Sequence, residues 1–396
     1  MTFRSLDGAA VRGQRALVRV DFNTPMADGK VADDTRLRAA LPTIARLRSG
    51  GAKVVLMAHF DRPKGRRVES MSLKPVVAPL ARLLDAPVAF AEDCVGVAAA
   101  AAIAGLKDGD VLLLENLRFH PGEEANDPTF ARALAANGDL YVDDAFSAAH
   151  RAHASTEAIA HVLPAYAGEA MRAELAALDA ALGAPSRPVL GIVGGSKVST
   201  KLDLLRNLIG KLDQLAIGGG MANTFLAAQG WDVGASFCEH DLADTARDIM
   251  DAAALTGCEL LLPLDVVVAD EAAAGQAAHV RELGDIDVDE KILDAGPMTV
   301  AHLDDAMDRA RTLVWNGPLG VFEIPPFDHA TITAARHAAA LAKAGRLTAV
   351  AGGGDTVAAL KHAGVAQDFT FVSTAGGAFL EWMEGRTLPG VAALEA

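Results

Sequence analysis

Polar side chains with the chemistry of an anion site follow the apolar segments of the first half of the chain. The positions are Asp21–Asn23, His59–Arg62, Asn116–Arg118, Asp143–Asp144 and His150–His153. Arg36 begins the first long helical pattern, where Asp33, Asp34 or Thr35 is a suitable cap. Arginine binds carboxylate or phosphate through two parallel hydrogen bonds. The pattern therefore predicts an anion site; scattered surface ion pairs are the alternative.

The second half carries glycine clusters, each between a predicted strand and a predicted helix. They are Gly194-Gly195-Ser196-Lys197 with Lys201 one turn later, Gly218–Gly220, Gly352-Gly353-Gly354-Asp355-Thr356 and Ala375-Gly376-Gly377. Glycine allows close backbone approach to a ligand, and the N-terminus of the following helix favours phosphate. Four such clusters, two of them with lysine or Asp-Thr attached, predict a nucleotide phosphate site. A single cluster would indicate only a tight turn.

Known fingerprints do not account for these clusters. Gly191–Val198 lacks the glycine before lysine and the Ser or Thr after it that a Walker A loop requires. The runs from Gly218 and Gly352 lack the third glycine of the dinucleotide fingerprint. No G-x-S-x-G elbow occurs, and His150 and His153 without an H-E-x-x-H pattern do not favour a catalytic zinc. An anion site combined with a non-Walker nucleotide site is typical of a kinase.

Short apolar segments alternate with alanine-rich helical ones, such as 34–49 and 73–84. The predicted strands are 15–22, 53–59, 88–92, 110–116, 140–146, 188–194, 214–218, 259–268, 312–316, 347–352 and 369–373. Nearly continuous apolar strands separated by helices indicate parallel sheets covered on both faces. We therefore expect an α/β fold of two Rossmann-like domains in tandem. Ligands of such sheets bind beyond the carboxyl ends of the strands, where the polar residues and glycines stand.

The domain boundary is predicted at a helical segment with apolar residues at helical spacing, 169–182, followed by the punctuation GAPSRP. We expect residues 1–168 to form the first domain, 169–185 a connecting helix and 186–386 the second domain. A surface helix inside one domain is the alternative for this segment.

Composition narrows the class of protein. The 396 residues are 51% apolar and 22% charged, as in folded proteins. The net charge of −15 disfavours a nucleic-acid or anionic-membrane binder, and nearly all of the deficit lies after residue 185. No signal peptide or membrane-spanning segment is predicted. The three cysteines (Cys94, Cys238, Cys258) form no C-x-x-C pair. We expect a cytoplasmic protein.

The residues that carry these signals belong to longer motifs, and through them the chain resembles phosphoglycerate kinases over nearly its full length. The matching stretches are RVDFN (19–23), DDTRLRAALPTI (33–44), HFDRPKG (59–65), LENLRFHPGEEAN (114–126), HRAHAST (150–156), GGSKVSTKL (194–202), GGGMANTFL (218–226), LLPLDVVVAD (261–270), VWNGPLGVFE (314–323), GGGDT (352–356) and LPGVAAL (388–394).

The resemblance implies a reversible phosphoryl transfer between 1,3-bisphosphoglycerate and MgADP, giving 3-phosphoglycerate and MgATP. It also implies a usually monomeric enzyme with a cleft between its domains and a C-terminal tail, 387–396, that packs back on the first domain. Asp21 and Asn23 are implied to hold the glycerate end. The implied partners of the triose phosphate and carboxylate are Arg36, His59, Arg62, Arg118 and Arg151.

The same resemblance implies a nucleotide site in the second domain. Its residues are Lys201 at the phosphates, Glu323 at the ribose, and Gly218, Gly219, Asn316, Pro318, Gly353, Gly354, Asp355 and Thr356 around the nucleotide. Asp355 is implied to bind Mg²⁺. Arg36 and Lys197 are implied to neutralise the transferring group, with Gly353 and Gly376 nearby.

This chemistry agrees with the residue types. Phosphoryl transfer depends mainly on positioning and charge stabilisation. An acyl phosphate already has a good leaving group and a carboxylate is already an anion, so no general base is needed. Sites on separate domains predict that the domains close around both ligands.

Four sites, one of them a pair of neighbouring residues, differ from the pattern associated with the family. Phe60 and Asp61 replace Leu-Gly, Asp143 replaces asparagine, Ser196 replaces alanine and Ala375 replaces glycine. Asp61 adds a negative charge near the anion site. None of the four removes a charged residue with an implied role. A nucleotide-dependent dehydrogenase and a two-domain binding protein are the alternative functions; the first lacks its glycine fingerprint and the second predicts an export signal or loss of Lys197, Lys201 or Asp355.

Overall fold

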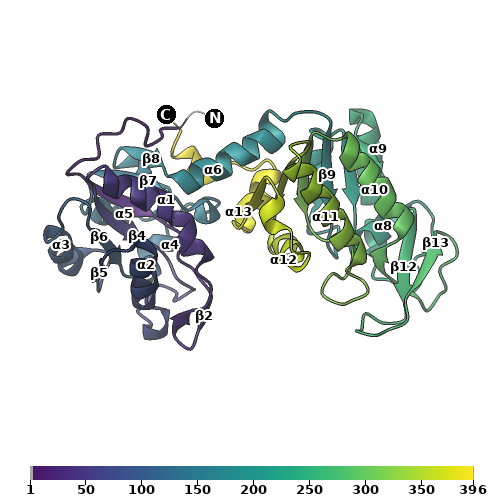
Figure 1. Ribbon diagram of the computed structural model, residues 1–396, viewed down its shortest axis with the longest axis horizontal. Helices are drawn as coiled ribbons and strands as arrows, with labels where there is room; N and C mark the ends of the chain where they lie inside the picture. The colour runs from purple at the N-terminus through teal and green to yellow at the C-terminus, as the bar shows by residue number, and fades with distance from the viewer. Residues whose placement is uncertain (1–2, 396) are drawn as a thin grey trace. The chain divides into compact units, whose positions relative to one another are not determined.

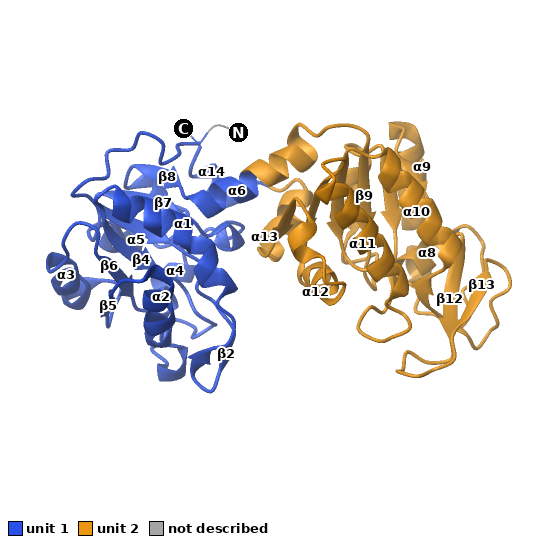
Figure 2. Ribbon diagram, viewed as in Figure 1, with its two compact units in different colours: residues 1–175, 387–396 blue, residues 176–386 orange. Residues whose placement is uncertain are grey.

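The structure, a computed structural model, describes residues 3–395 and divides the chain into two compact units (Figures 1 and 2). Unit 1 comprises Met1–Leu175 with Thr387–Ala396, and unit 2 comprises Ala176–Arg386. Helix α6 (Glu169–Leu178) runs across this division and continues as a π-helical turn over Asp179–Gly183, so the predicted helix over 169–182 ends earlier as a regular α-helix.

Unit 1 is built on a six-stranded sheet in which every neighbouring pair is parallel, in the order β5-β6-β4-β1-β7-β8. Its strands are β1 (Arg15–Arg19), β4 (Lys53–Met57), β5 (Val88–Ala91), β6 (Val111–Leu114), β7 (Leu140–Asp143) and β8 (Ala165–Ala167), beside a hairpin of β2 (Met26–Ala27) and β3 (Lys30–Val31). Its helices are α1 (Thr35–Ser49), α2 (Val77–Leu84), α3 (Gly96–Ala104), α4 (Pro121–Glu124), α5 (Pro128–Ala135) and α14 (Pro389–Ala392).

Unit 2 has a second parallel sheet of six strands, in the order β11-β10-β9-β15-β16-β17. These strands are β9 (Val189–Val193), β10 (Gln214–Ile217), β11 (Glu259–Leu261), β15 (Thr312–Asn316), β16 (Thr348–Gly352) and β17 (Phe371–Ser373). The helices are α7 (Leu202–Ile209), α8 (Gly220–Ala228), α9 (Ala243–Thr256), α10 (Pro297–Arg309), α11 (His329–Lys343), α12 (Gly354–His362) and α13 (Gly377–Met383).

The burial of the central strands explains why their sequences are continuously apolar and do not alternate between apolar and polar residues. Every residue of β6, β7, β9 and β15 is buried, because helices cover both faces of each sheet. In unit 1, α1 contributes Leu37, Ile44 and Leu47 to this core. In unit 2, α10 and α11 pack on β15 and β16, where Trp315 is buried. The predicted α/β fold with two parallel sheets is confirmed.

One predicted strand is wrong in its extent. Residues 259–268 form two strands, β11 and β12 (Asp265–Ala269), which belong to different sheets. Pro263 lies between them and cannot donate a ladder hydrogen bond. β12 joins β13 (His279–Glu282) and β14 (Lys291–Ala295) in an antiparallel sheet that the sequence analysis did not predict.

The C-terminal tail belongs to unit 1 (Figure 2). Leu388, Val391 and Leu394 are buried there, and the N–H of Gly390 donates to the carbonyl of Ala149 at 2.9 Å. Within residues 3–395, no helix is long and apolar enough to cross a membrane.

Candidate active site

In the sheet of unit 1, β4, β5 and β6 lie on one side of β1, whereas the later strands β7 and β8 lie on its other side. The boundary between β1 and β7 is therefore a topological switch point, where ligands of open α/β sheets bind. Asp21 and Asn23 follow β1, and Ser147 follows β7. The carboxylate of Asp21 pairs with the guanidinium of Arg36, at the start of α1, and accepts a hydrogen bond from the Ser147 hydroxyl at 2.5 Å. Although burial alone would raise it, the Arg36 charge and these hydrogen bonds lower the pKa of Asp21 to about 2.

The start of α1 explains why Arg36 reaches this carboxylate. The Asp33 side chain, rather than that of Asp34, accepts the N–H of Thr35 at 2.7 Å. Asp34 instead forms an exposed ion pair with Arg38 one turn into the helix. Arg36 is thereby placed in the first turn, next to the β1 loop, with its side chain about one-third exposed (31%).

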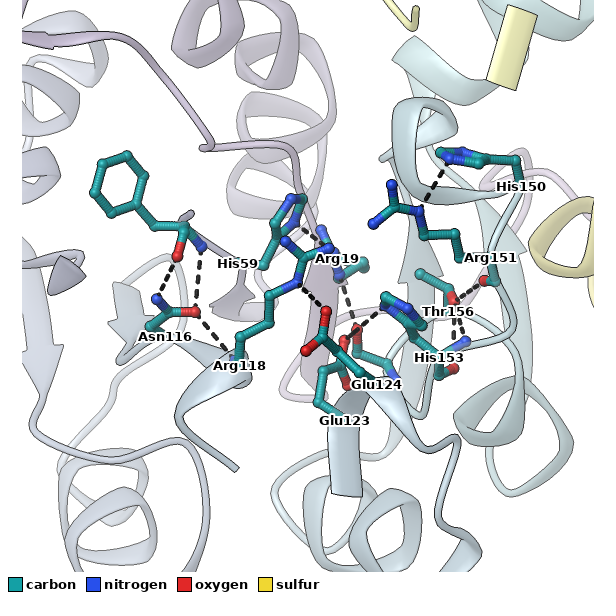
Figure 3. A network of polar contacts seen from close by, with 12 residues as sticks. Arg19, His59, Asn116, Arg118, Glu123, Glu124, His150, Arg151, His153 and Thr156 are labelled. Carbon is teal, nitrogen blue, oxygen red and sulfur yellow. Dashed lines mark hydrogen bonds and ion pairs between the residues drawn. The ribbon is translucent and has the colours of Figure 1, made fainter. Parts of the chain in front are cut away.

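Basic residues from three other loops gather in the network of Figure 3, and one of them, His59, lies within electrostatic reach of Asp21. Arg118 is buried; one of its terminal nitrogens donates to the carbonyl of Asp61 at 2.7 Å, whereas its buried Nε makes no hydrogen bond. Its nearest carboxylate is Glu124, at 3.5 Å. The Nε of Arg151 donates to the ring of His150 at 3.1 Å. Burial together with Arg118, Arg19 and Arg151 lowers the pKa of His153 to about 4, so this histidine is neutral at pH 7.

The substituted loop 60–62 is held by local hydrogen bonds. Asp61 has a positive φ of 54°, a conformation that favours glycine and that aspartate tolerates, which explains why Leu-Gly is usual here. Its N–H donates to the side chain of Asn23 at 3.0 Å. Its carboxylate accepts the N–H of Arg62 at 2.9 Å and is thereby held in the turn. Arg62 itself is exposed.

The structure also reveals residues that the sequence analysis missed in unit 1. Arg19 is completely buried at the end of β1, where it contacts His59. Glu123 and Ser155 complete the same network, and Ser147 contacts Asp21. Their motifs were recognised, but their individual roles were not, because an arginine inside an apolar strand gives no sign of its partners. Asp143, which replaces the usual asparagine, is buried, and burial raises its pKa to about 6.

In unit 2 the switch point lies between β9 and β15, in the strand order 3-2-1-4-5-6 of dinucleotide-binding sheets. The loops after these strands touch backbone to backbone. A Cβ on Gly194 would stand 1.8 Å from the carbonyl oxygen of Pro318, and one on Gly317, with φ of 104°, would meet Gly194. Glycine at these positions is therefore a steric requirement.

The side chain of Lys201 links the β9 and β15 ends at this switch point. Its ammonium donates to the carbonyl of Gly194 at 2.6 Å and to the side chain of Asn316 at 2.6 Å. Asn316 in turn donates to the carbonyl of Gly352 at 2.9 Å. Burial lowers the pKa of Lys201 to about 8, and the charge of Asp355 opposes that shift. An anion bound here would favour the charged ammonium.

A cavity of about 400 Å³ opens beside these loops. Of the predicted nucleotide residues, Gly219, Pro318, Glu323 and Asp355 line it. Gly218 does not line the cavity. It packs against the lining residue Leu319, which a Cβ on Gly218 would meet at 2.6 Å. Gly195, Ser196 and Gly220 of the predicted glycine clusters line the cavity as well. Lining residues that the sequence analysis missed include Asn223, Phe237, Leu293, Asp294 and Leu319. The apolar members come from β14 and separate loops and share no motif.

The remaining predicted residues of unit 2 do not line the cavity. Gly353 has a positive φ of 100°, and Gly354 begins α12. Thr356 is buried and accepts the N–H of Gly317 at 2.7 Å, so it ties α12 to the β15 loop. Gly376, with φ of 58°, precedes the short helix α13. Lys197 is exposed, with its ammonium 5.8 Å from the centre of the Phe237 ring.

One further cluster holds metal-ligating side chains outside these sites. In Asp93, Cys94 and His120 the ligating atoms lie within 4.8 Å of one another. The Oδ1 of Asp93 already accepts the N–H of Cys94 at 2.7 Å and contacts the His120 ring at 2.7 Å. The cluster is satisfied within the protein.

Unit 1 thus presents a cluster of cationic side chains, and unit 2 presents a cavity beside glycine-rich loops at its strand ends. These two sites define an α/β protein that binds phosphorylated small molecules. Comparisons with known proteins resolve the class. The sequence model of the family described as "Phosphoglycerate kinase" matches residues 6–386, and the chain belongs to that family.

Relatives and solved structures agree over the whole chain. A "Phosphoglycerate kinase" of Caulobacter vibrioides is 70% identical over 396 residues, covering all of both chains. The structure of phosphoglycerate kinase from Coxiella burnetii superposes with a TM-score of 0.93 at 41% identity, covering 99% of each chain. That of the Pyrococcus horikoshii enzyme gives 0.81 at 30% identity, covering 99% of this chain and 98% of the other.

The chain is therefore a phosphotransferase of glycolysis. It transfers a phosphoryl group reversibly between 1,3-bisphosphoglycerate and ADP, giving 3-phosphoglycerate and ATP.

Proposed function

We propose that unit 1 binds the triose substrate and unit 2 the nucleotide. Arg36, His59, Arg62, Arg118 and Arg151 bind the phosphate and carboxylate of the triose, and Asp21 and Asn23 hold its glycerate end. The observation that carries this assignment is Arg118, a buried guanidinium whose Nε makes no hydrogen bond to a described residue, although it lies 3.5 Å from the Glu124 carboxylate. A buried cation with an unused donor is stabilised by an anion.

For unit 2, the cavity beside the switch point supports a nucleotide site. Gly219 and Pro318 form part of its wall, Gly218 packs against the lining residue Leu319, and Glu323 is an exposed carboxylate on the lining, suited to a ribose hydroxyl. Lys201 holds phosphates beside the N-terminus of α12, where Gly353, Gly354 and Thr356 bring the backbone close. Asn316 positions Lys201 through its side-chain oxygen.

Asp355 fits the Mg²⁺ that accompanies ATP. It is an exposed carboxylate on the first turn of α12, it lines the cavity, and it lies within electrostatic reach of Lys201. Mg²⁺ in nucleotide sites is held by one or two carboxylates together with phosphate oxygens. When bound, the ion would neutralise phosphate charge; the protein's part is to present one carboxylate.

The chain's own residues accomplish the transfer by positioning and charge. Arg36 and Lys197 neutralise the transferring group, and the backbone at Gly353 and Gly376 approaches it closely. No general base is required, because the acceptor in the direction of ATP consumption is a carboxylate.

Replacing Arg36 tests the assignment. We expect Arg36→Ala to lower kcat at least about 100-fold, as loss of one preorganised charge does, while the fold is retained. Arg38→Ala is the matched control, because Arg38 lies on the same helix in an exposed ion pair. Both are assayed with ATP and 3-phosphoglycerate. A rise in KM with unchanged kcat for Arg36→Ala would contradict its role in transfer.

Transfer also requires the two ligands to come together, because we assign them to separate units. We propose that the units close when both are bound. Small-angle scattering should then show a smaller radius of gyration with 3-phosphoglycerate and a non-hydrolysable MgATP analogue together than with either alone. An unchanged radius would exclude closure. Lys197→Ala, which leaves the residues proposed for the triose and Lys201 in place, serves to separate closure from turnover.

We further propose a cytoplasmic monomer that binds small molecules and no nucleic acid. The net charge of −15 supports the absence of nucleic-acid binding, since it opposes association with polyanions.

A further inference from the structure

The completely buried Arg19 makes three directional contacts in unit 1 (Figure 3). Its Nε donates to the Ser155 hydroxyl at 2.9 Å, and one terminal nitrogen donates to the carbonyl of Val20 at 2.6 Å. Its other terminal nitrogen lies 2.9 Å from Nδ1 of His59. The side chain is thus fixed at each of its three nitrogens, and one terminal nitrogen is directed at the His59 ring.

The contact with His59 has only one chemically allowed direction. A guanidinium has five N–H donors, no acceptor, and no neutral form in a protein. Nδ1 of His59 must therefore be the acceptor, and it carries no proton. With Nδ1 unprotonated the ring is neutral, and burial with the nearby charges of Arg19 and Arg118 lowers the pKa of His59 well below its usual value against the opposing charge of Asp21. Its single proton is then on Nε2.

We propose that Arg19 is a positioning residue that fixes His59 as the Nε2–H tautomer. His59 then presents an uncharged N–H donor, rather than an imidazolium, among the cationic side chains of the triose site. That last consequence rests on the proposed function of His59; the tautomer itself does not.

Glu123 and Ser155 hold Arg19 in this orientation. Because the Ser155 oxygen accepts from Arg19, its hydroxyl proton is directed to Glu123, whose Oε1 lies at 2.6 Å. The other Glu123 oxygen accepts the N–H of Ser155 at 3.0 Å. Both carboxyl oxygens of Glu123 thus accept hydrogen bonds from Ser155. Burial raises the pKa of Glu123, and the charge of Arg19 together with these hydrogen bonds opposes that shift. Every hydrogen bond in the chain from Glu123 to His59 has a fixed direction.

The ¹⁵N NMR signals of the imidazole nitrogens test the tautomer directly in the full-length protein, with His59 assigned by its loss in His59→Gln. We expect a protonated Nε2 and an unprotonated Nδ1 from pH 6 to 8. A protonated Nδ1 in the wild-type protein, in either the neutral or the imidazolium form, would overturn the proposal whatever the variants do.

Arg19→Met removes the donors at similar length, and we expect His59 to populate both tautomers there. Affinity for 3-phosphoglycerate should fall about tenfold, as for loss of one oriented hydrogen bond, with ATP affinity unchanged. Arg15→Met on the same strand, which loses a partly exposed ion pair with Asp139 and hydrogen bonds to the carbonyls of Ala136 and Gly138, is the control and should retain one tautomer. A single Nε2–H tautomer in folded Arg19→Met would contradict the proposal.

Should Arg19→Met not fold, Ser155→Ala is the second variant, because it interrupts the chain one step away. It should also mix the tautomers, and an unmixed ring would count against the proposal. Addition of 3-phosphoglycerate to the wild-type protein separates the two claims: unperturbed His59 signals would refute its proposed contact with substrate but not its tautomer.

Discussion

Single side chains in this enzyme behave according to the environment that the fold gives them. Arg36 and Arg38 lie in the same turn of α1, yet one pairs with a partly buried carboxylate and the other with an exposed one. Lys197 and Lys201 are four residues apart, yet only Lys201 is held by backbone and side-chain oxygens. The type of a residue therefore indicates the chemistry it can perform, whereas its burial and its partners decide which of several residues of that type can perform it.

Asp294, on the cavity wall, offers a test at this scale. It is buried, its Oδ2 accepts the N–H of Ala330 at 2.9 Å, and burial raises its pKa to about 8 against the opposing effect of that bond. The folded state thus binds more protons than the unfolded state between about pH 4 and 8, so stability falls as pH rises through this window.

We expect Asp294→Asn to remove this contribution, which is at most about 1.4 kcal/mol per pH unit. Urea unfolding from pH 5 to 8.5 measures it. The exposed Asp270→Asn should leave the slope as in the wild-type protein. Identical slopes for Asp294→Asn and the wild-type protein would show that Asp294 does not retain its proton on folding.

At the scale of elements, both sites lie where a parallel sheet reverses its strand order. β1 and β7 supply the loops of unit 1, and β9 and β15 those of unit 2. In unit 2 the two loops are in backbone contact, which fixes the position of Lys201 and of the cavity rim. The glycines there serve the approach of loop to loop, as well as any approach of loop to ligand.

Gly194→Ala tests this packing. A Cβ 1.8 Å from a backbone oxygen forces the β9 and β15 loops apart, and we expect a loss of more than about 2 kcal/mol in unfolding free energy. Gly210→Ala, where the nearest atom would lie 4.0 Å away, should change it by less than about 0.5 kcal/mol. Equal effects of the two substitutions would mean that the loops are not tightly packed.

At the scale of the whole molecule, the chain begins and ends in the same unit. The tail buries Leu388, Val391 and Leu394 in unit 1, after the chain has built all of unit 2. Unit 1 is consequently complete only when the last ten residues are present, and its stability depends on contacts that are distant in sequence.

Ending the chain after Arg386 should lower the stability of unit 1 by about 4–9 kcal/mol, from the three apolar side chains removed at about 1.5–3 kcal/mol each. Hydrogen exchange should quicken in β7 and β8 and remain unchanged in β9 and β15. Replacing the three residues by alanine in the full-length chain should give a smaller effect of the same distribution. Equal loss of protection in both units would refute a tail that serves unit 1 alone.

Much of this could be predicted from the sequence. Continuous apolar strands fix parallel sheets, because only strands covered on both faces lack alternation. Glycines and charged residues after those strands fix the edge at which ligands bind. The single strand expected over 259–268 was wrong, because its apolar residues continue across Pro263 and periodicity does not register the change of sheet.

Only the tertiary structure decided which side chains meet. Arg19 reads as one arginine in an apolar strand, and its contacts with Ser155 and His59 join residues 136 and 40 positions away. The apolar cavity wall likewise comes from separate loops. Local sequence determines the backbone and the kinds of group at each sheet edge. Hydrogen-bond direction and burial depend on residues far along the chain, so they emerge only when the sheets are assembled.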